Sequence, residues 1–186
     1  MKKLLFVLAF LVGGATQAAP ITYNVNRTIG PGSVTGALTT DGTIGVLNAA
    51  NILSWSFAID DGDGSGPLQI TSGVNATLLL QGNLLFGDAD SLDFNFGGLA
   101  GFALFQSPST GSGQDWWCVE GAASSCAGTG QGESVNRLGL PAHQFYSTSV
   151  EIGTVEDSHA VPEPGSLALV GLALLALTGA RRYKRG

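Results

Sequence analysis

Apolar and polar residues alternate in two short segments of the chain. In residues 51–59, one set of alternate positions is apolar: Leu53, Trp55, Phe57 and Ile59. The positions between them are small or polar: Ser54, Ser56 and Ala58. Residues 91–96 repeat the pattern with Leu92, Phe94 and Phe96. A period of two is typical of a strand with one buried face, so we expect these aromatic side chains in a hydrophobic core.

Other segments complete an all-β pattern. Weaker alternation or short apolar runs mark five more stretches: 21–29, 33–40, 76–81, 99–105 and 144–152. Turn-forming clusters separate them, in a chain with 28 glycines among 186 residues. No long amphipathic helix is predicted, and residues 46–53 suit a single helical turn. About eight to ten short strands at this spacing predict an antiparallel β-sandwich, jelly-roll-like, over residues 19–160.

The first 18 residues have the pattern of a secretory signal peptide. Lys2 and Lys3 precede an apolar run, 4–12, and small residues follow it. The run is too short to span a bilayer, which needs about 17–25 apolar residues. Small side chains suit a signal peptidase cut between Ala18 and Ala19. We therefore expect export of the rest of the chain.

The C-terminal region predicts a membrane anchor. Residues 164–180 carry no charge. The length of this uncharged run is at the lower limit for crossing a bilayer. Four basic residues follow at once: Arg181, Arg182, Lys184 and Arg185. Positive charge next to a span favours the cytoplasmic side. We expect a transmembrane helix over 165–180 and a basic tail, 181–186, inside the cell.

The C-terminal region also resembles a known sorting signal. The string Val161-Pro162-Glu163-Pro164, the apolar run with Gly171-Leu172 inside it and the basic cluster are similar to the PEP-CTERM signal over residues 161–186. The resemblance implies recognition by exosortase, a membrane protease-transpeptidase. It also implies transient anchoring in the inner membrane of a Gram-negative-type bacterium and release to the cell envelope or extracellular matrix. The amino-acid sequence of residues 33–57 also resembles a segment of other exported PEP-CTERM proteins.

Charge limits the partners of the exported domain. Residues 19–160 hold thirteen acidic side chains and only two basic ones, Arg27 and Arg137. Such an acidic surface repels phosphate backbones and anionic polysaccharides, so we expect no nucleic-acid partner.

Three groups of residues are candidates for specific chemistry. Cys118 and Cys126, the two cysteines of an exported chain, predict a disulfide. Asp61, Asp63 and Ser65 have the 1-3-5 spacing of a calcium loop, although the expected glutamate at position 12 is Ser72. The alternative is a set of solvated turns. Trp116 and Trp117 suit stacking on sugar rings, and the alternative is packing around the nearby disulfide. In a strand, one of the two faces the core and the other faces outward.

We find no motif of nucleophilic or zinc-dependent catalysis. The sequence therefore predicts a non-enzymatic exported protein with no cofactor other than the candidate calcium. A structural or adhesive role among the exopolysaccharides of a biofilm is the first hypothesis. A lectin-like carbohydrate-binding module is the alternative.

Overall fold

The computed structural model describes residues 18–107, 115–123, 129–137 and 140–155. Within these ranges the chain forms one short 3-10 turn, η1 (Ala49–Asn51), and thirteen strands. The strands are β1 (Ile21–Ile29), β2 (Gly32–Thr40), β3 (Gly45–Val46), β4 (Ile52–Asp60), β5 (Leu68–Thr71), β6 (Thr77–Gly82), β7 (Leu85–Gly87), β8 (Ser91–Asn95), β9 (Gly101–Ser107), β10 (Asp115–Glu120), β11 (Gly132–Arg137), β12 (Ala142–Gln144) and β13 (Ser149–Val155). The predicted signal peptide and tail helix lie outside the described residues. Within the described ranges, no helix has the length and apolarity needed to cross a bilayer.

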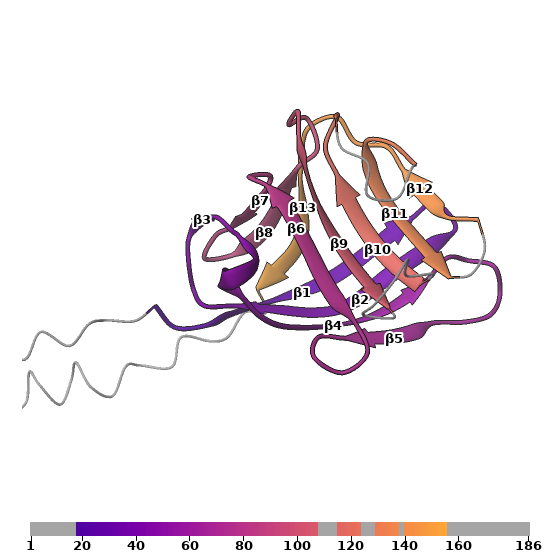
Figure 1. Cartoon of the computed structure of the whole chain (residues 1–186), viewed down its shortest axis with the longest axis horizontal. Helices are drawn as coiled ribbons and strands as arrows, with labels where there is room; N and C mark the ends of the chain where they lie inside the picture. The colour runs from indigo at the N-terminus through magenta and orange to yellow at the C-terminus, as the bar shows by residue number, and fades with distance from the viewer. Residues whose placement is uncertain (1–17, 108–114, 124–128, 138–139, 156–186) are drawn as a thin grey trace, which may run out of the picture. The chain divides into compact units, whose positions relative to one another are not determined.

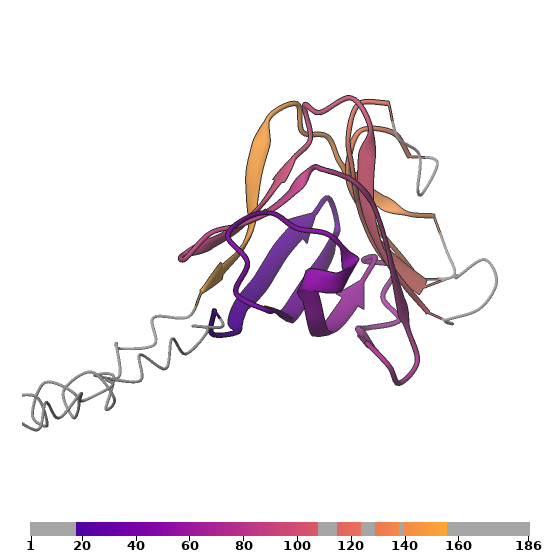
Figure 2. The same cartoon turned by 60° about the vertical axis from the view of Figure 1, so that its left-hand side comes forward.

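The strands form two antiparallel sheets. The first has the order β3-β7-β8-β13-β1-β2-β4-β5, and the second has the order β12-β11-β10-β9-β6. Figures 1 and 2 show the second sheet lying across the strands β1, β2 and β4 of the first. The predicted all-β architecture of two antiparallel sheets is therefore confirmed.

Hairpins between sequence neighbours dominate the connections. β1, β2, β4 and β5 pair in that order, and so do β9, β10, β11 and β12. A jelly-roll is built from Greek-key crossings. Here the chain mostly runs back and forth, and β13 returns to pair with both β8 and β1. The jelly-roll detail of the prediction is not seen in this strand order.

Aromatic side chains from both sheets fill the core. Trp55 and Phe57 of β4 meet Phe105 of β9 and Trp117 of β10, with ring centroids 4.9 to 5.5 Å apart. Edge-to-face and offset contacts at this distance stabilise beyond the area that they bury. Phe94 and Phe96 are also fully buried, so the predicted core positions are confirmed.

One residue that the alternation places on the apolar side of its strand is exposed because the sheet is irregular. Leu53 is 55% exposed, unlike Trp55, Phe57 and Ile59 in the same strand. The pairing of β2 with β4 shifts between Thr39 and Thr40, which leaves Leu53 without a partner. Such a β-bulge adds one residue to one strand and interrupts the alternation. The prediction for Leu53 was therefore wrong.

Two further details differ from the predicted strands. β6 is only half buried, since Leu79 is 47% exposed while Leu78 and Leu80 pack against the core. Residues 145–148 are not in a strand and separate β12 from β13. Strands as short as β3 and β12 have no alternation to detect, and this is why the described residues contain more strands than predicted. The helical turn expected within 46–53 is confirmed as η1.

Local polar contacts hold the connection between β2 and β4. Asp41 accepts a hydrogen bond from the Thr43 backbone at 3.0 Å and another from the Asn51 side chain at 3.0 Å. Asn48 and Asn51 cap η1 reciprocally. These hydrogen bonds lower the pKa of Asp41 below its ordinary value. These contacts fix the conformation of the connection between β2 and β4.

Candidate functional site

A buried ion pair joins the two sheets. Arg27 on β1 points between the sheets, and its NH2 donates to Glu133 Oε2 on β11 at 2.9 Å. Glu133 is fully buried and also accepts from the Trp117 indole N–H at 3.0 Å. The same guanidinium donates to the Tyr146 hydroxyl at 3.1 Å and to the Glu151 carbonyl at 2.8 Å. We call Arg27, Glu133, Trp117 and Tyr146 the inter-sheet cluster.

Burial and hydrogen bonding act in opposite directions on this pair. Burial raises the pKa of the Glu133 carboxyl, although hydrogen bonds and charge from Arg27 and the hydrogen bond from Trp117 oppose the shift. Burial alone would lower the pKa of Arg27, but the hydrogen bond and charge of Glu133 outweigh it and raise that pKa. Because Glu133 is enclosed and Arg27 satisfies it with hydrogen bonds from the other sheet, the cluster is a structural lock between the sheets.

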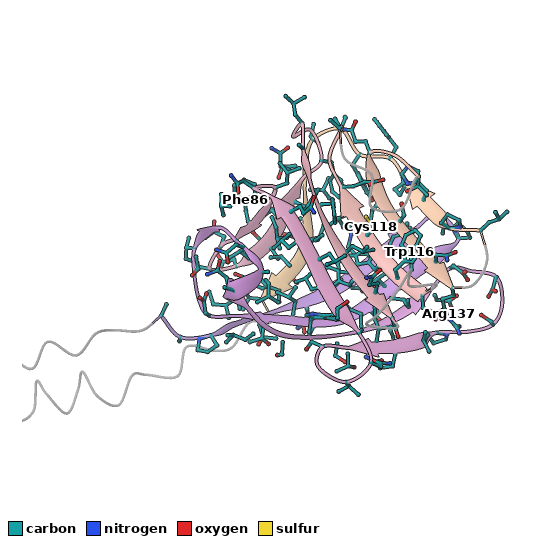
Figure 3. All side chains as sticks on the ribbon, viewed as in Figure 1. Phe86, Trp116, Cys118 and Arg137 are labelled. Carbon is teal, nitrogen blue, oxygen red and sulfur yellow. The ribbon has the colours of Figure 1, made fainter. Side chains whose placement is uncertain are left out.

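The second arginine, Arg137, lies at the end of β11 beside the loop 60–66 (Figure 3). Its NH1 donates to Ser65 Oγ at 3.0 Å and to the Gly66 carbonyl. Its backbone N–H donates to Asp61 Oδ2 at 2.7 Å. Its Nε lies 3.9 Å from Asp115 Oδ1, and neither of these buried atoms has a hydrogen-bond partner. Burial raises the pKa of Asp115 despite the nearby Arg137 charge.

The predicted calcium residues therefore have protein partners in the structure. Asp61 Oδ1 accepts from the Asp63 backbone at 3.3 Å, and Asp63 Oδ1 accepts from the Ser65 backbone at 2.7 Å. Aspartate suits such a loop because its side chain accepts local backbone hydrogen bonds. Asp61 is only 4% exposed, however, so it is not the solvated residue that the alternative interpretation expected. Within the described part of the chain, no three His, Cys, Asp or Glu residues are grouped to hold a metal. Calcium binding by Asp61, Asp63 and Ser65 stays a prediction.

The two adjacent tryptophans face opposite sides of β10. Trp117 is fully buried in the core, while Trp116 is partly exposed on the outer side of the second sheet (Figure 3). Trp117 is therefore not available for a sugar ring. Cys118 is buried on β10, and no free thiol is found among the described cysteines. Its predicted partner, Cys126, lies outside the described residues, so the bridge between them stays a prediction.

A polar network covers the outer side of β10 and β11. Ser134 Oγ lies 3.0 Å from His143 Nδ1 and 2.6 Å from Thr129 Oγ1. A serine beside a histidine is the pair used in nucleophilic catalysis. Ser134, however, is fully buried, as is the nearby Glu120. A substrate has no access to this hydroxyl, so the pair is a structural network in this fold.

The outer face of the first sheet carries rows of uncharged, mostly polar side chains on β13, β1, β2, β4 and β5. Cross-strand pairing aligns Thr22 with Thr39 and Ser54 in one row. The next two rows are Thr154, Asn24, Ala37, Ser56 and Thr71, and then Asn26, Thr35, Ala58 and Gln69. None of these twelve positions carries a charge. We call them the hydroxyl–amide face.

Hydrogen bonds order the side chains of this face. Thr22 Oγ1 and Thr39 Oγ1 are 2.9 Å apart, and Ser56 Oγ and Thr71 Oγ1 are 2.8 Å apart. Gln69 Nε2 donates to Ser56 Oγ at 2.8 Å. The polar positions of residues 21–28 and 54–58 were visible in the sequence. Their convergence into one surface depends on the pairing of four hairpin-connected strands and of β13, which sequence reasoning did not supply.

The C-terminal region was compared with known families. Residues 160–185 match the family described as the PEP-CTERM protein-sorting motif. The chain carries this sorting signal. The predicted motif, Val161, Pro162, Glu163 and Pro164, and the basic residues Arg181, Arg182, Lys184 and Arg185 lie within the matched segment, although outside the described residues. The PEP-CTERM chain is thus an exosortase substrate, exported to the cell envelope or extracellular space. No curated protein and no solved structure matches it.

Proposed function

We propose that this PEP-CTERM protein is a non-enzymatic structural or adhesive component of an exopolysaccharide matrix. The hydroxyl–amide face is the observation that carries the proposal. Its twelve positions are uncharged in a region whose acidic side chains outnumber its basic ones by thirteen to two. A surface of hydroxyl and amide groups exchanges hydrogen bonds with the hydroxyls of a neutral polysaccharide without the cost of desolvating a charge.

The overall charge supports the same class of partner. Acidic side chains outnumber basic ones in residues 19–160, and Asp60 lies in the row next to the face, so anionic polymers are repelled while neutral ones approach. Ordered side chains also lose less conformational freedom on contact than free ones. Many weak, repeated contacts along a polymer chain give useful retention even when each one is weak. This suits a protein that is delivered outside the cell by exosortase.

The test places charge on the face in the full-length chain. Thr35→Glu with Gln69→Glu adds two carboxylates to one row, while Gln81→Glu with Gln144→Glu adds two to exposed positions of the second sheet. The fraction of processed protein that stays with the native host's washed exopolysaccharide is compared with the fraction in the medium. We expect the face variant to move to the medium and the control to remain. Equal retention of both would overturn the proposal.

A further inference from the structure

We propose that a groove at one edge of the two sheets, beside Trp55, binds a neutral sugar unit. The groove has a volume of about 450 Å³. That volume is within the range of ligand sites in proteins, about 300–1,000 Å³. Trp55 of β4, the turn that follows β5 and the start of β6 line it. The inference rests on the proposed contact with neutral polysaccharide and assigns it a second, concave site.

The groove combines an apolar wall with hydrogen-bonding groups. Val74, Ala76 and Leu78 supply apolar surface. Ser72 Oγ accepts from the Trp55 backbone N–H at 3.0 Å, which leaves its own hydroxyl proton to donate. Thr77 adds a second hydroxyl. Sugars present both C–H surface and hydroxyl groups, so this mixture matches them.

Trp55 supplies a donor without an acceptor. Its indole N–H has no hydrogen-bond partner in the part of the chain that the structure describes, in contrast to the Trp117 indole, which donates to Glu133. Trp55 is only 4% exposed, yet its nitrogen is not among the sealed polar atoms without a partner. Since Trp55 lines the groove, we infer that its N–H donates to a ligand hydroxyl there.

The lining excludes charged ligands. It contains Trp, Ser, Gly, Val, Ala, Thr and Leu, and no charged side chain. A carboxylate or phosphate entering the groove would lose water without gaining an opposite charge. A neutral hexose unit of a polymer or oligosaccharide is therefore the ligand class. The slight exposure of Trp55 limits it to presenting an edge rather than a ring face for stacking.

The experiment uses the full-length chain, purified in a detergent without a sugar headgroup. Equilibrium dialysis measures binding of labelled cellohexaose, maltohexaose, mannohexaose and chitohexaose, with hexagalacturonate as the anionic comparison. We expect the parent protein to bind at least one neutral hexasaccharide and not the anionic one. Thr77→Phe, which fills the groove, should weaken binding about tenfold or more. Leu79→Phe is the matched control because it lies on the same strand but outside the groove.

Trp55→Phe separates the donor from the ring. The variant keeps an aromatic ring beside Phe57 and Phe105 but removes the N–H, so binding should weaken about threefold to tenfold. Thermal melts show whether Trp55→Phe is still folded. If it is not, the comparison of Thr77→Phe with Leu79→Phe is the test of the groove. Absence of binding by the parent protein, or equal binding by Thr77→Phe and Leu79→Phe, would overturn the groove.

The two proposals fail in different ways. The Thr35→Glu, Gln69→Glu variant leaves the groove intact, so it should still bind the soluble hexasaccharide while losing retention in the matrix. If matrix retention depends on the face but the protein binds no hexasaccharide, only the proposed groove site is refuted. If the protein binds a hexasaccharide but the face variant is retained in the matrix like the parent, only the proposed role of the face is refuted.

Discussion

The two arginines of the exported domain occupy opposite kinds of environment. Arg27 lies between the sheets and meets a fully buried carboxylate, a hydroxyl and a carbonyl. Arg137 lies at the end of a strand. Its NH1 donates to Ser65 and Gly66 of the loop 60–66, while its Nε has no hydrogen bond. Both side chains are about equally exposed, at 15% in each ion pair. Exposure alone therefore does not separate them.

What separates the two arginines is the state of the partner. Glu133 is fully buried, so removal of Arg27 leaves a buried carboxyl group without its charged partner. Asp115 keeps 19% of its side chain exposed and makes no hydrogen bond with Arg137, so removal of this guanidinium breaks no hydrogen bond to a fully buried carboxyl group. We therefore expect the loss of Arg27 to lower the free energy of unfolding strongly, and the loss of Arg137 to affect mainly the loop 60–66.

The largest effect should follow the loss of Arg27. Arg27→Met removes the partner of a buried carboxylate, which typically costs about 3–5 kcal/mol of unfolding free energy. Thermal and urea unfolding, followed by near-ultraviolet circular dichroism, measure this loss. The double variant Arg27→Met, Glu133→Leu removes both groups and should recover most of it, because well-packed apolar pairs often replace buried ion pairs without loss. Equal losses in the single and double variants would contradict a lock based on this pair.

The second effect is the pH dependence of stability. Burial raises the pKa of Glu133 in the folded protein above its ordinary value of 4.5. The folded state therefore holds its proton to a higher pH than the unfolded state. This contribution is fully present below about pH 4.5 and is lost as the pH rises through the folded pKa. The difference in melting temperature between the parent protein and Glu133→Gln, measured at successive pH values, should show this decline.

Other carboxyl groups also titrate over this pH range. The quantity to compare is therefore the difference in melting temperature between Glu133→Gln and the parent. The pKa of Asp115 is also raised by burial, while hydrogen bonds lower those of Asp41 and Asp63. Their contributions are common to the parent and to Glu133→Gln, and they cancel in the difference. A difference that stays constant with pH would show that Glu133 does not titrate differently in the two states.

A smaller effect should follow the loss of Arg137. Arg137→Gln removes the NH1 contacts with Ser65 and Gly66 but keeps the backbone hydrogen bond to Asp61. A typical hydrogen bond contributes about 0.5–1.5 kcal/mol, so we expect loss of the two NH1 contacts to cost about 1–2 kcal/mol. The same unfolding measurements test it. A loss as large as that of Arg27→Met would remove the distinction between the two sites.

The smallest effect concerns calcium and the loop 60–66. The Arg137 guanidinium already binds Ser65 Oγ and the Gly66 carbonyl, and a calcium ion would compete for these oxygens. We expect millimolar calcium to shift the melting temperature of the parent by about 1 °C or less, and that of Arg137→Gln by more. A large shift in the parent, reversed by a chelator, would instead support the calcium site predicted from the sequence.

Local pattern alone was enough for several features. The alternation in residues 54–59 and 91–96 identified buried Trp55, Phe57, Phe94 and Phe96, because a strand places every second side chain on one face. The C-terminal sorting signal was recognised in the same way, since its motif, apolar run and basic cluster are contiguous. Asp61 and Asp63 were recognised as part of a loop, although the burial of Asp61 and its hydrogen bond from the Arg137 backbone were not.

Tertiary structure decided everything that depends on which strands lie side by side. Arg27 and Glu133 are 106 residues apart, and Asp61 and Arg137 are 76 apart. No local period relates such positions, because sheet order and the facing of the two sheets bring them together. The bulge that exposes Leu53 and the rows of the hydroxyl–amide face likewise follow from register between strands. The sequence by itself determined strands and destination, and only the packing of the sheets determined which polar groups are locked inside and which face solvent.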